Sequence, residues 1–114
     1  MRTDRDRLLD VLEAIERIEQ YAPLGKEVFD RDRLIQTWVV HHLEIIGEAC
    51  RALSEDLVRK HADADWKRII GMRNVLAHRY FEIDVDIVWS VVEHDLPALK
   101  DNIQAILKSL GKGP

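Results

Sequence analysis

The sequence predicts an all-α fold, an up-and-down bundle of about five helices. Apolar residues recur at helical spacing along most of the chain, with charged residues between them. Proline and glycine stand mainly near the ends of these segments, where helices stop. The 114 residues are 46% hydrophobic and show no repeat or linker, so residues 1–114 are expected to form one domain around one core.

The first two helices have the clearest patterns. Helical spacing of apolar residues predicts a first helix over about residues 4–21, which ends before Pro23. The second and longest helix is expected to begin after Asp30 or Asp32, either of which could cap it. Gly47 lies in its middle, where glycine costs about 1 kcal/mol relative to alanine, and close packing of a neighbouring helix would explain it. The apolar stripe of this second helix comprises Leu34, Trp38, Leu43, Ile45, Ile46, Ala49 and Leu53.

The second half of the chain contains one segment with conflicting signals. Ser54 begins a short helical turn or a loop that runs through His61, and Asp65 is expected to cap a third helix. Residues 81–88 alternate like a half-buried strand, but Asp84 could cap a helix formed by the same residues. Because a lone strand would have no evident partner in this chain, we expect a helix. A final helix is expected to begin at residues 95–97, with its proline in the first turn.

Composition excludes several classes of protein. The longest apolar stretches are far shorter than a bilayer span, so no membrane partner is expected. The N-terminus mixes both charge signs and lacks the unbroken apolar run of an export signal. Cys50 is the only cysteine, which excludes an internal disulfide and fits a reducing compartment. The sequence therefore predicts a cytoplasmic protein.

Charge is unevenly distributed along the chain. The formal net charge of −4 is unfavourable for a protein that binds nucleic acid. From Arg59 to Tyr80, however, six basic residues outweigh two acidic residues, which gives a local charge of +4. Residues 81–97 contain five acidic residues and no Lys or Arg. A polyanion could therefore use only the first of these stretches, and charge permits RNA binding without indicating it.

The segment from Arg73 to Tyr80 carries the most reactive set of side chains. It places a permanent cation, the imidazole of His78 and a phenol within eight residues. Histidine can both accept and donate a proton near neutral pH, and arginine offers a fixed fork of donors to phosphate oxygens. The two could cleave RNA without a metal. His78 would assist attack by the 2′-hydroxyl or protonate the leaving oxygen, while Arg73 stabilises charge on the phosphoryl oxygens.

Helical geometry restricts how Arg73 and His78 could meet. Five helical positions rotate by about 500°, which leaves the two side chains roughly 140° apart. They therefore do not share a face unless the helix ends before His78 or a two-fold dimer brings copies of both together. The alternative is structural: His78 and Arg79 would interact with the carbonyls and the dipole at a helix C-terminus. Spacing alone favours this structural interpretation.

Other candidate residues point to structural roles. His41, Glu44 and Glu48 share a helical face at i, i+3 and i+7, as metal ligands might. A solvated face or a polar dimer contact is the more common meaning of such a pattern, and no metal is expected. His42 is expected to be a core or interface histidine, and Cys50 a small buried hydrophobe. The tryptophans are expected to be core or interface residues rather than base-stacking platforms.

The segment Arg73-x4-His78-x-Tyr80 resembles the signature of the HepT-like toxins, a branch of the HEPN superfamily. The surrounding sequence is similar as well, so that the resemblance extends over nearly the whole chain and is more specific than the short motif. The matching segments are Leu43-Glu-Ile-Ile-Gly-Glu-Ala, Trp66-Lys-Arg-Ile-Ile-Gly-Met-Arg-Asn, Tyr80-Phe-Glu-Ile-Asp, Val88-Trp89 and Asp95-Leu-Pro-Ala-Leu.

This resemblance implies a dimeric helical bundle that acts as a metal-independent RNA endonuclease toxin, with no cofactor. It implies that Arg73 and His78 are catalytic and that Asn74 is a supporting polar residue. It also implies a partner, an MntA-like nucleotidyltransferase antitoxin, which silences the toxin by transferring AMP to Tyr80. The alternative is a catalytically silent module that dimerises and engages such a nucleotidyltransferase. The intact Arg73 and His78 favour the enzyme, whereas the acidic net charge favours the module.

Overall fold

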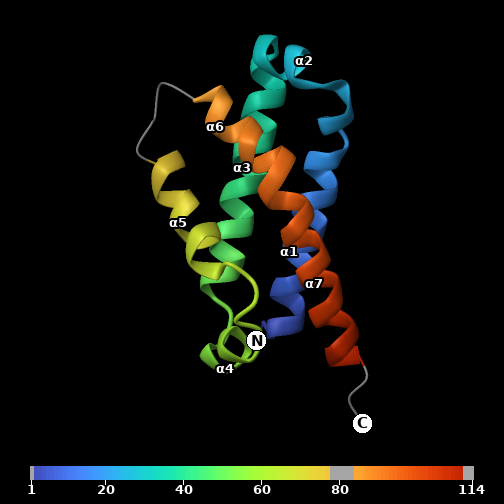
Figure 1. Ribbon diagram of the computed structural model, residues 1–114, viewed down its shortest axis with the longest axis vertical. Helices are drawn as coiled ribbons and strands as arrows, with labels where there is room; N and C mark the ends of the chain where they lie inside the picture. Colours follow the sequence, from blue (N-terminus) through green and yellow to red (C-terminus); the bar gives the residue numbers. More distant parts are fainter. Residues whose placement is uncertain (1, 78–83, 112–114) are drawn as a thin grey trace.

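The computed structural model describes residues 2–77 and 84–111, with residues 72–77 described as backbone alone. The regular secondary structure of this part of the chain is entirely helical, with no strand, which confirms the all-α prediction (Figure 1). The elements in chain order are α1 (Asp4–Glu19), the 3₁₀ helix η1 (Ala22–Leu24), α2 (Lys26–Arg31), α3 (Arg33–Arg51), α4 (Glu55–Lys60), α5 (Trp66–Ala77), α6 (Val85–Ser90), the π-helical segment η2 (Val91–Asp95) and α7 (Leu96–Gly111).

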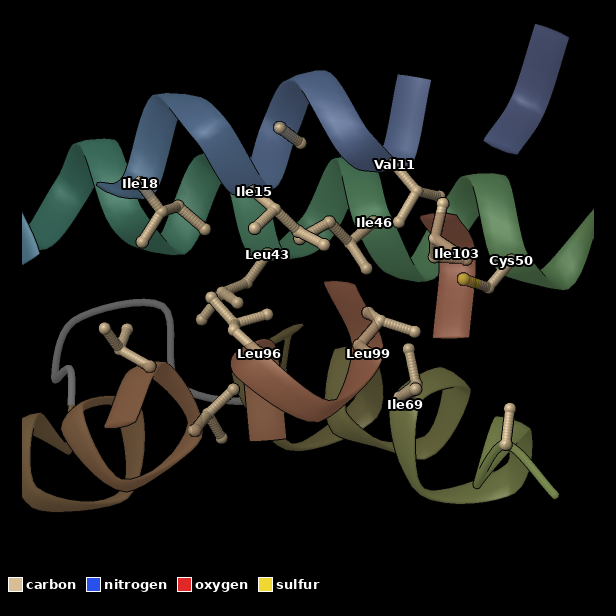
Figure 2. Packing of buried hydrophobic residues seen from close by; sticks show 14 of the residues in the cluster. Val11, Ile15, Ile18, Leu43, Ile46, Cys50, Ile69, Leu96, Leu99 and Ile103 are labelled. Carbon is tan, nitrogen blue, oxygen red and sulfur yellow. The ribbon is translucent and has the colours of Figure 1, made fainter. Parts of the chain in front are cut away.

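The long helices pack in two layers. In Figure 1, α1 and α3 run side by side along the length of the molecule, and α5 lies against α3. Figure 2 shows α1 and α3 above the layer that contains α5 and α7, with the core side chains between the layers. The fully buried core residues of α1, α3 and α7 include Leu8, Val11, Ile15, Ile18, Leu43, Ile46, Leu99 and Ile103.

Local capping signals set the helix starts as the sequence predicts. Asp32 accepts a hydrogen bond from the Ile35 amide at 3.1 Å and so begins α3. Asp65 does the same for α5 at 3.2 Å, and Asp84 for α6 at 3.2 Å. Each carboxylate satisfies an amide that has no partner inside its helix. The helical interpretation of the segment after Asp84 is therefore confirmed.

The predicted break before the last helix is wrong. α6, η2 and α7 follow one another directly, so residues 85–111 form one continuous helical rod. Pro97 explains the π-helical segment, because proline inside a helix clashes with the carbonyl four residues earlier and lacks an amide hydrogen. Within η2 the Leu96 amide donates to the carbonyl of Val91, five residues back. This wider turn lets the helix continue past the proline.

The connection between α1 and α3 contains a helix that the sequence did not predict. Gly25 has a φ of 91°, and the short helix α2 follows it. α2 buries Phe29, which is 2% exposed. The side-chain amide of Gln36 donates through Nε2 to the Phe29 carbonyl at 2.8 Å, so α3 holds the end of α2. With six residues and one buried apolar side chain, α2 has too short a pattern to be recognised.

The apolar stripe predicted for α3 is partly wrong. Leu34, in the first turn of α3, is 84% exposed because the core does not extend that far. Ile45 and Ala49 are only half-buried, whereas Leu43 and Ile46 are fully buried. Gly47, for which close packing of a neighbouring helix is predicted, is buried. The inward face of α3 is therefore narrower than the sequence pattern indicates.

Candidate active site

The helix α5 carries the first part of the Arg73 to Tyr80 motif. Its start is fixed by the Asp65 cap and by Trp66, which is 5% exposed and whose indole N–H donates to the His61 carbonyl at 2.9 Å. Ile69, one turn later, is buried in the core. α5 packs along α3. The motif is thus attached to the bundle through the buried first turns of α5.

The structure places only part of the predicted site. Arg73 and Asn74 lie on the helical backbone of α5, near its last described residue, Ala77. The side chains of both residues lie outside the described part of the structure, as do His78 and Tyr80 altogether. The roles of these four residues therefore stay predictions.

An ion pair links α5 to the rod that follows the motif. Arg68 Nε lies 3.1 Å from Asp95 Oδ2, with side chains that are 63% and 23% exposed. An ion pair with this much exposure contributes at most about 1 kcal/mol to stability. The ion pair matters for geometry, because it joins α5 to the rod of residues 85–111 at a point other than the motif segment that connects them along the chain. Sequence reasoning missed this pair, whose partners are 27 positions apart.

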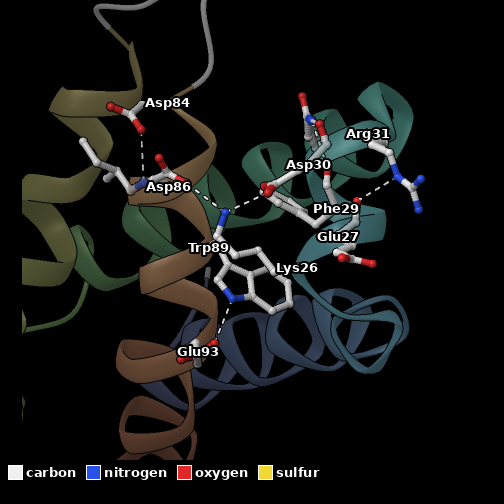
Figure 3. Close-up of polar contacts among 11 residues, drawn as sticks. Lys26, Glu27, Phe29, Asp30, Arg31, Asp84, Asp86, Trp89 and Glu93 are labelled. Carbon is white, nitrogen blue, oxygen red and sulfur yellow. Dashed lines mark hydrogen bonds and ion pairs between the residues drawn. The ribbon is translucent and has the colours of Figure 1, made fainter.

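A second set of contacts holds the start of α6, which comes directly after the motif segment. Lys26 Nζ lies 2.7 Å from Asp30 and 2.9 Å from Asp86, so it joins α2 to α6 (Figure 3). These two carboxylates raise the pKa of Lys26, which is therefore charged at neutral pH. Beneath this ion pair the rings of Phe29 and Trp89 are in contact, with centroids 5.4 Å apart. We call these contacts the α2–α6 brace.

The brace is completed by hydrogen bonds on α6 itself. The indole N–H of Trp89 donates to Glu93 Oε2 at 2.8 Å, and Asp84 caps the helix (Figure 3). The acidic stretch after the motif is thus partly used for structure: Asp84 as a cap, Asp86 as a partner of Lys26 and Glu93 as an acceptor. Local sequence signals reveal only the cap, because the other contacts depend on the tertiary fold.

The acidic and histidine face of α3 borders an open groove. His41, Glu44 and Glu48 line a groove of about 470 Å³ between α1 and α3, together with Arg7 and Asp10. Among the residues that the structure describes, no group of three or more His, Cys, Asp or Glu side chains could hold a metal ion. The groove is therefore lined by side chains of both charge signs.

Two predictions about single residues are confirmed. His42 is 8% exposed, and its Nδ1 lies 2.7 Å from the Trp38 carbonyl, so it is a satisfied core histidine. Cys50 is 1% exposed, and burial raises the pKa of its thiol to about 12. This thiol stays protonated at neutral pH and behaves as an apolar core residue.

Within residues 2–77 and 84–111, no helix is long and apolar enough to cross a membrane.

Comparisons with known proteins point in one direction. A model of the family described as ribonuclease HepT-like matches residues 11–106. The chain is 38% identical over 108 residues to the protein named "Probable ribonuclease HepT" of Thermococcus cleftensis. The aligned region covers 94% of this chain and 98% of that protein. The chain is 24% identical over 125 residues to the "mRNA nuclease HepT" of Shewanella oneidensis. That alignment covers 89% of this chain and 93% of that protein. No solved structure matches the chain.

Proposed function

Because the chain belongs to the ribonuclease HepT-like family, as the motif predicts, we propose that it is a metal-independent RNA endonuclease that uses Arg73 and His78. One observation carries this proposal: the family match runs over residues 11–106 and so includes the whole motif. The relatives from Thermococcus and Shewanella are named as a ribonuclease and an mRNA nuclease. The position of Arg73 and Asn74 on a helix anchored in the core supports the same proposal.

The proposed reaction is transfer of the phosphoryl group to the neighbouring 2′-oxygen. His78 takes the proton of the 2′-hydroxyl, and the 2′-oxygen then forms a bond to phosphorus. The bond from phosphorus to the 5′-oxygen breaks, that oxygen takes up a proton from solvent water, and His78 returns its proton to the solvent. Arg73 donates hydrogen bonds to the phosphoryl oxygens as charge builds on them, and Asn74 supports the arrangement. The products are a 2′,3′-cyclic phosphate and a 5′-hydroxyl.

Cleavage of RNA by the purified chain is expected to continue in excess EDTA, because the proposed chemistry needs only protein side chains. The assay uses end-labelled single-stranded RNA, and mass spectrometry of the fragments identifies their ends. A 2′,3′-cyclic phosphate is expected. Cleavage that stops on chelation and returns with a divalent cation would contradict the proposed mechanism.

The proposed site is shared between two copies of the chain. Arg73 and His78 are about 140° apart if the helical rotation continues between them, so neighbouring copies can complete each other's site across a two-fold axis. We expect a homodimer in sedimentation experiments at concentrations of tens of micromolar. A monomer alone under these conditions would contradict a shared site.

We further propose that the chain is the cytoplasmic toxin of a toxin–antitoxin pair. Its partner would be an MntA-like nucleotidyltransferase that transfers AMP from ATP to the Tyr80 hydroxyl. The support is the family membership and the chemistry of the motif. A phosphodiester beside Arg73 and His78 would bring a negative charge to the position that the RNA phosphate must occupy. Silencing then follows from repulsion and from the bulk of the added nucleotide.

The second candidate function is a binding module without catalysis. The observation that favours it is the net charge of −4, which is unfavourable for a protein that binds RNA. Such a module would dimerise and engage the nucleotidyltransferase but leave RNA intact. The cleavage assay separates the two functions directly.

A further inference from the structure

One face of α5 is not covered by the residues that the structure describes. Positions 67, 71 and 74 follow each other at i, i+4 and i+7, so they lie within about 60° of one another around the helix. Positions 67 and 71 lie on the side of the helix away from Trp66 and Ile69, the buried residues through which α5 joins the core. Lys67 is exposed and Gly71 is half-exposed. We call Lys67, Gly71 and the backbone position of Asn74 the open face of α5.

Gly71 is the unusual residue of this face. Glycine in the middle of a helix lowers helix stability relative to alanine. Packing does not explain it, because a Cβ atom at Gly71 would meet no heavy atom within 4 Å in the described part of the chain. A glycine that leaves open space on a helix is suited to close approach by a molecule outside this chain.

The charge next to Gly71 indicates an anionic partner. Lys67, one turn before Gly71, makes no ion pair among residues 2–77 and 84–111. Arg68 is 63% exposed, and it pairs with Asp95, a carboxylate of the following rod. The open face also lies within the stretch from Arg59 to Tyr80, whose residues sum to +4 in a chain of net charge −4.

Lys67 and Gly71, the residues of the open face whose side-chain positions the structure describes, lack the apolar character that the centre of an interface between copies would have. The centre of such an interface is rich in apolar and aromatic side chains. The large exposed hydrophobic residues of the described structure belong to other elements: Leu9, Leu24, Leu34, Ile87 and Leu110. A lysine, a glycine and an asparagine position instead suit a phosphate backbone, which needs a cation, hydrogen-bond donors and room.

We propose that the open face of α5 binds the phosphate backbone of single-stranded RNA and guides the strand toward the Arg73 and His78 motif. This inference rests on the proposed function, because it assigns a binding surface on α5 to the RNA substrate of that function. Lys67 attracts a phosphate, and Gly71 allows the strand to lie close to the helix. Position 74 is on the same side of the helix, four residues before His78 in the sequence, so the strand would run along this face toward the part of the motif that contains His78.

The test measures binding separately from cleavage. The probe is a fluorescent single-stranded RNA with 2′-O-methyl groups, which has no free 2′-hydroxyl and cannot undergo the proposed reaction. Anisotropy titrations at several salt concentrations compare the wild-type chain with Lys67→Gln and Gly71→Gln. Lys108→Gln is the matched control, because Lys108 is an exposed lysine on α7 that makes no ion pair in the described structure. Gly71→Ala measures how removal of the glycine changes helix stability when no long side chain is added.

Lys67→Gln is expected to weaken binding by about fivefold at 0.1 M salt and to lower the salt slope by about 0.7, the loss of one phosphate contact. Gly71→Gln should weaken binding at least as much, because its side chain keeps the strand away from the helix. Gly71→Ala should raise the thermal midpoint by about 5 °C, since alanine favours the helix and fits the open space. Lys108→Gln should bind like the wild type.

Three results decide the inference. Equal affinity and equal salt slope in wild type, Lys67→Gln and Gly71→Gln would overturn it. Unchanged RNA binding combined with a shift of either variant to a smaller species in sedimentation would also overturn it and would assign the face to contact between copies. Binding that depends on Lys67 and Gly71 in a wild-type chain that does not cleave RNA would support the open face and contradict the proposed catalysis.

Discussion

His78→Ala is expected to lower the rate of RNA cleavage by about 10²- to 10⁴-fold, the usual loss when a general acid or base is removed. Arg73→Ala is expected to lower it by about 10²- to 10³-fold, because one set of hydrogen bonds to the charged phosphoryl oxygens is lost. The rate of cleavage of labelled RNA is the measurement. Helical circular dichroism should persist in both variants, since the buried core that the structure describes lies in other residues.

Matched controls are available for both substitutions. His94 is an exposed histidine in η2, and Arg5 is an exposed arginine near the start of α1. His94→Ala and Arg5→Ala should cleave RNA at the wild-type rate. Activity equal to wild type in His78→Ala or Arg73→Ala would remove that residue from the mechanism. Conversion of Arg73 to lysine is not a conservative test, because lysine lacks the fork of donors that matches phosphate.

Transfer of AMP to Tyr80 is expected to suppress cleavage nearly completely. The experiment incubates the chain with a cognate nucleotidyltransferase, ATP and Mg²⁺, and measures mass and activity on the same sample. One or more AMP units should appear on Tyr80 as cleavage falls, because the added phosphodiester repels the RNA phosphate from Arg73 and His78. Tyr80→Phe should block the addition and retain much of the cleavage, since the phenol takes no part in the proposed proton transfers.

Tyr21 provides the control for this experiment. It is the only other tyrosine in the sequence, and its ring is half-buried against Trp38, with centroids 5.9 Å apart. Tyr21→Phe should be modified and silenced like the wild type. If Tyr80→Phe is still silenced through modification elsewhere, Tyr80 is not the switch. If folded Tyr80→Phe loses all cleavage, the tyrosine belongs to the catalytic set.

The fold could be predicted where the deciding signals were local. Asp32, Asp65 and Asp84 act within three residues of the amides that they cap, so their roles can be recognised from the sequence. The segment after Asp84 had two possible periodicities, and the cap together with the lack of a partner strand indicated the correct one. The exposure of Leu34 could not be predicted in this way, because it depends on where the core ends.

Contacts between distant segments were beyond prediction from one sequence. Lys26 and Asp86 are 60 positions apart, and no local pattern links them. The π-helical segment required knowing that the rod continues through Pro97, whereas the proline itself suggested a new helix. The chemistry of the candidate site was indicated mainly by the resemblance of residues 73–80 to the HepT-like signature, because residue type permits phosphate chemistry but spacing alone favours a structural role for His78. How the side chains of the motif approach one another stays a prediction.

The most direct test of the central claim is a side-by-side cleavage assay of wild-type chain and His78→Ala on the same labelled RNA in excess EDTA. The claim is that protein side chains alone cleave RNA at the motif. We predict steady cleavage with 2′,3′-cyclic phosphate ends by the wild type and a rate at least about 10²-fold lower for a folded His78→Ala. Equal rates for the two proteins, or no cleavage by the wild type, would contradict the claim.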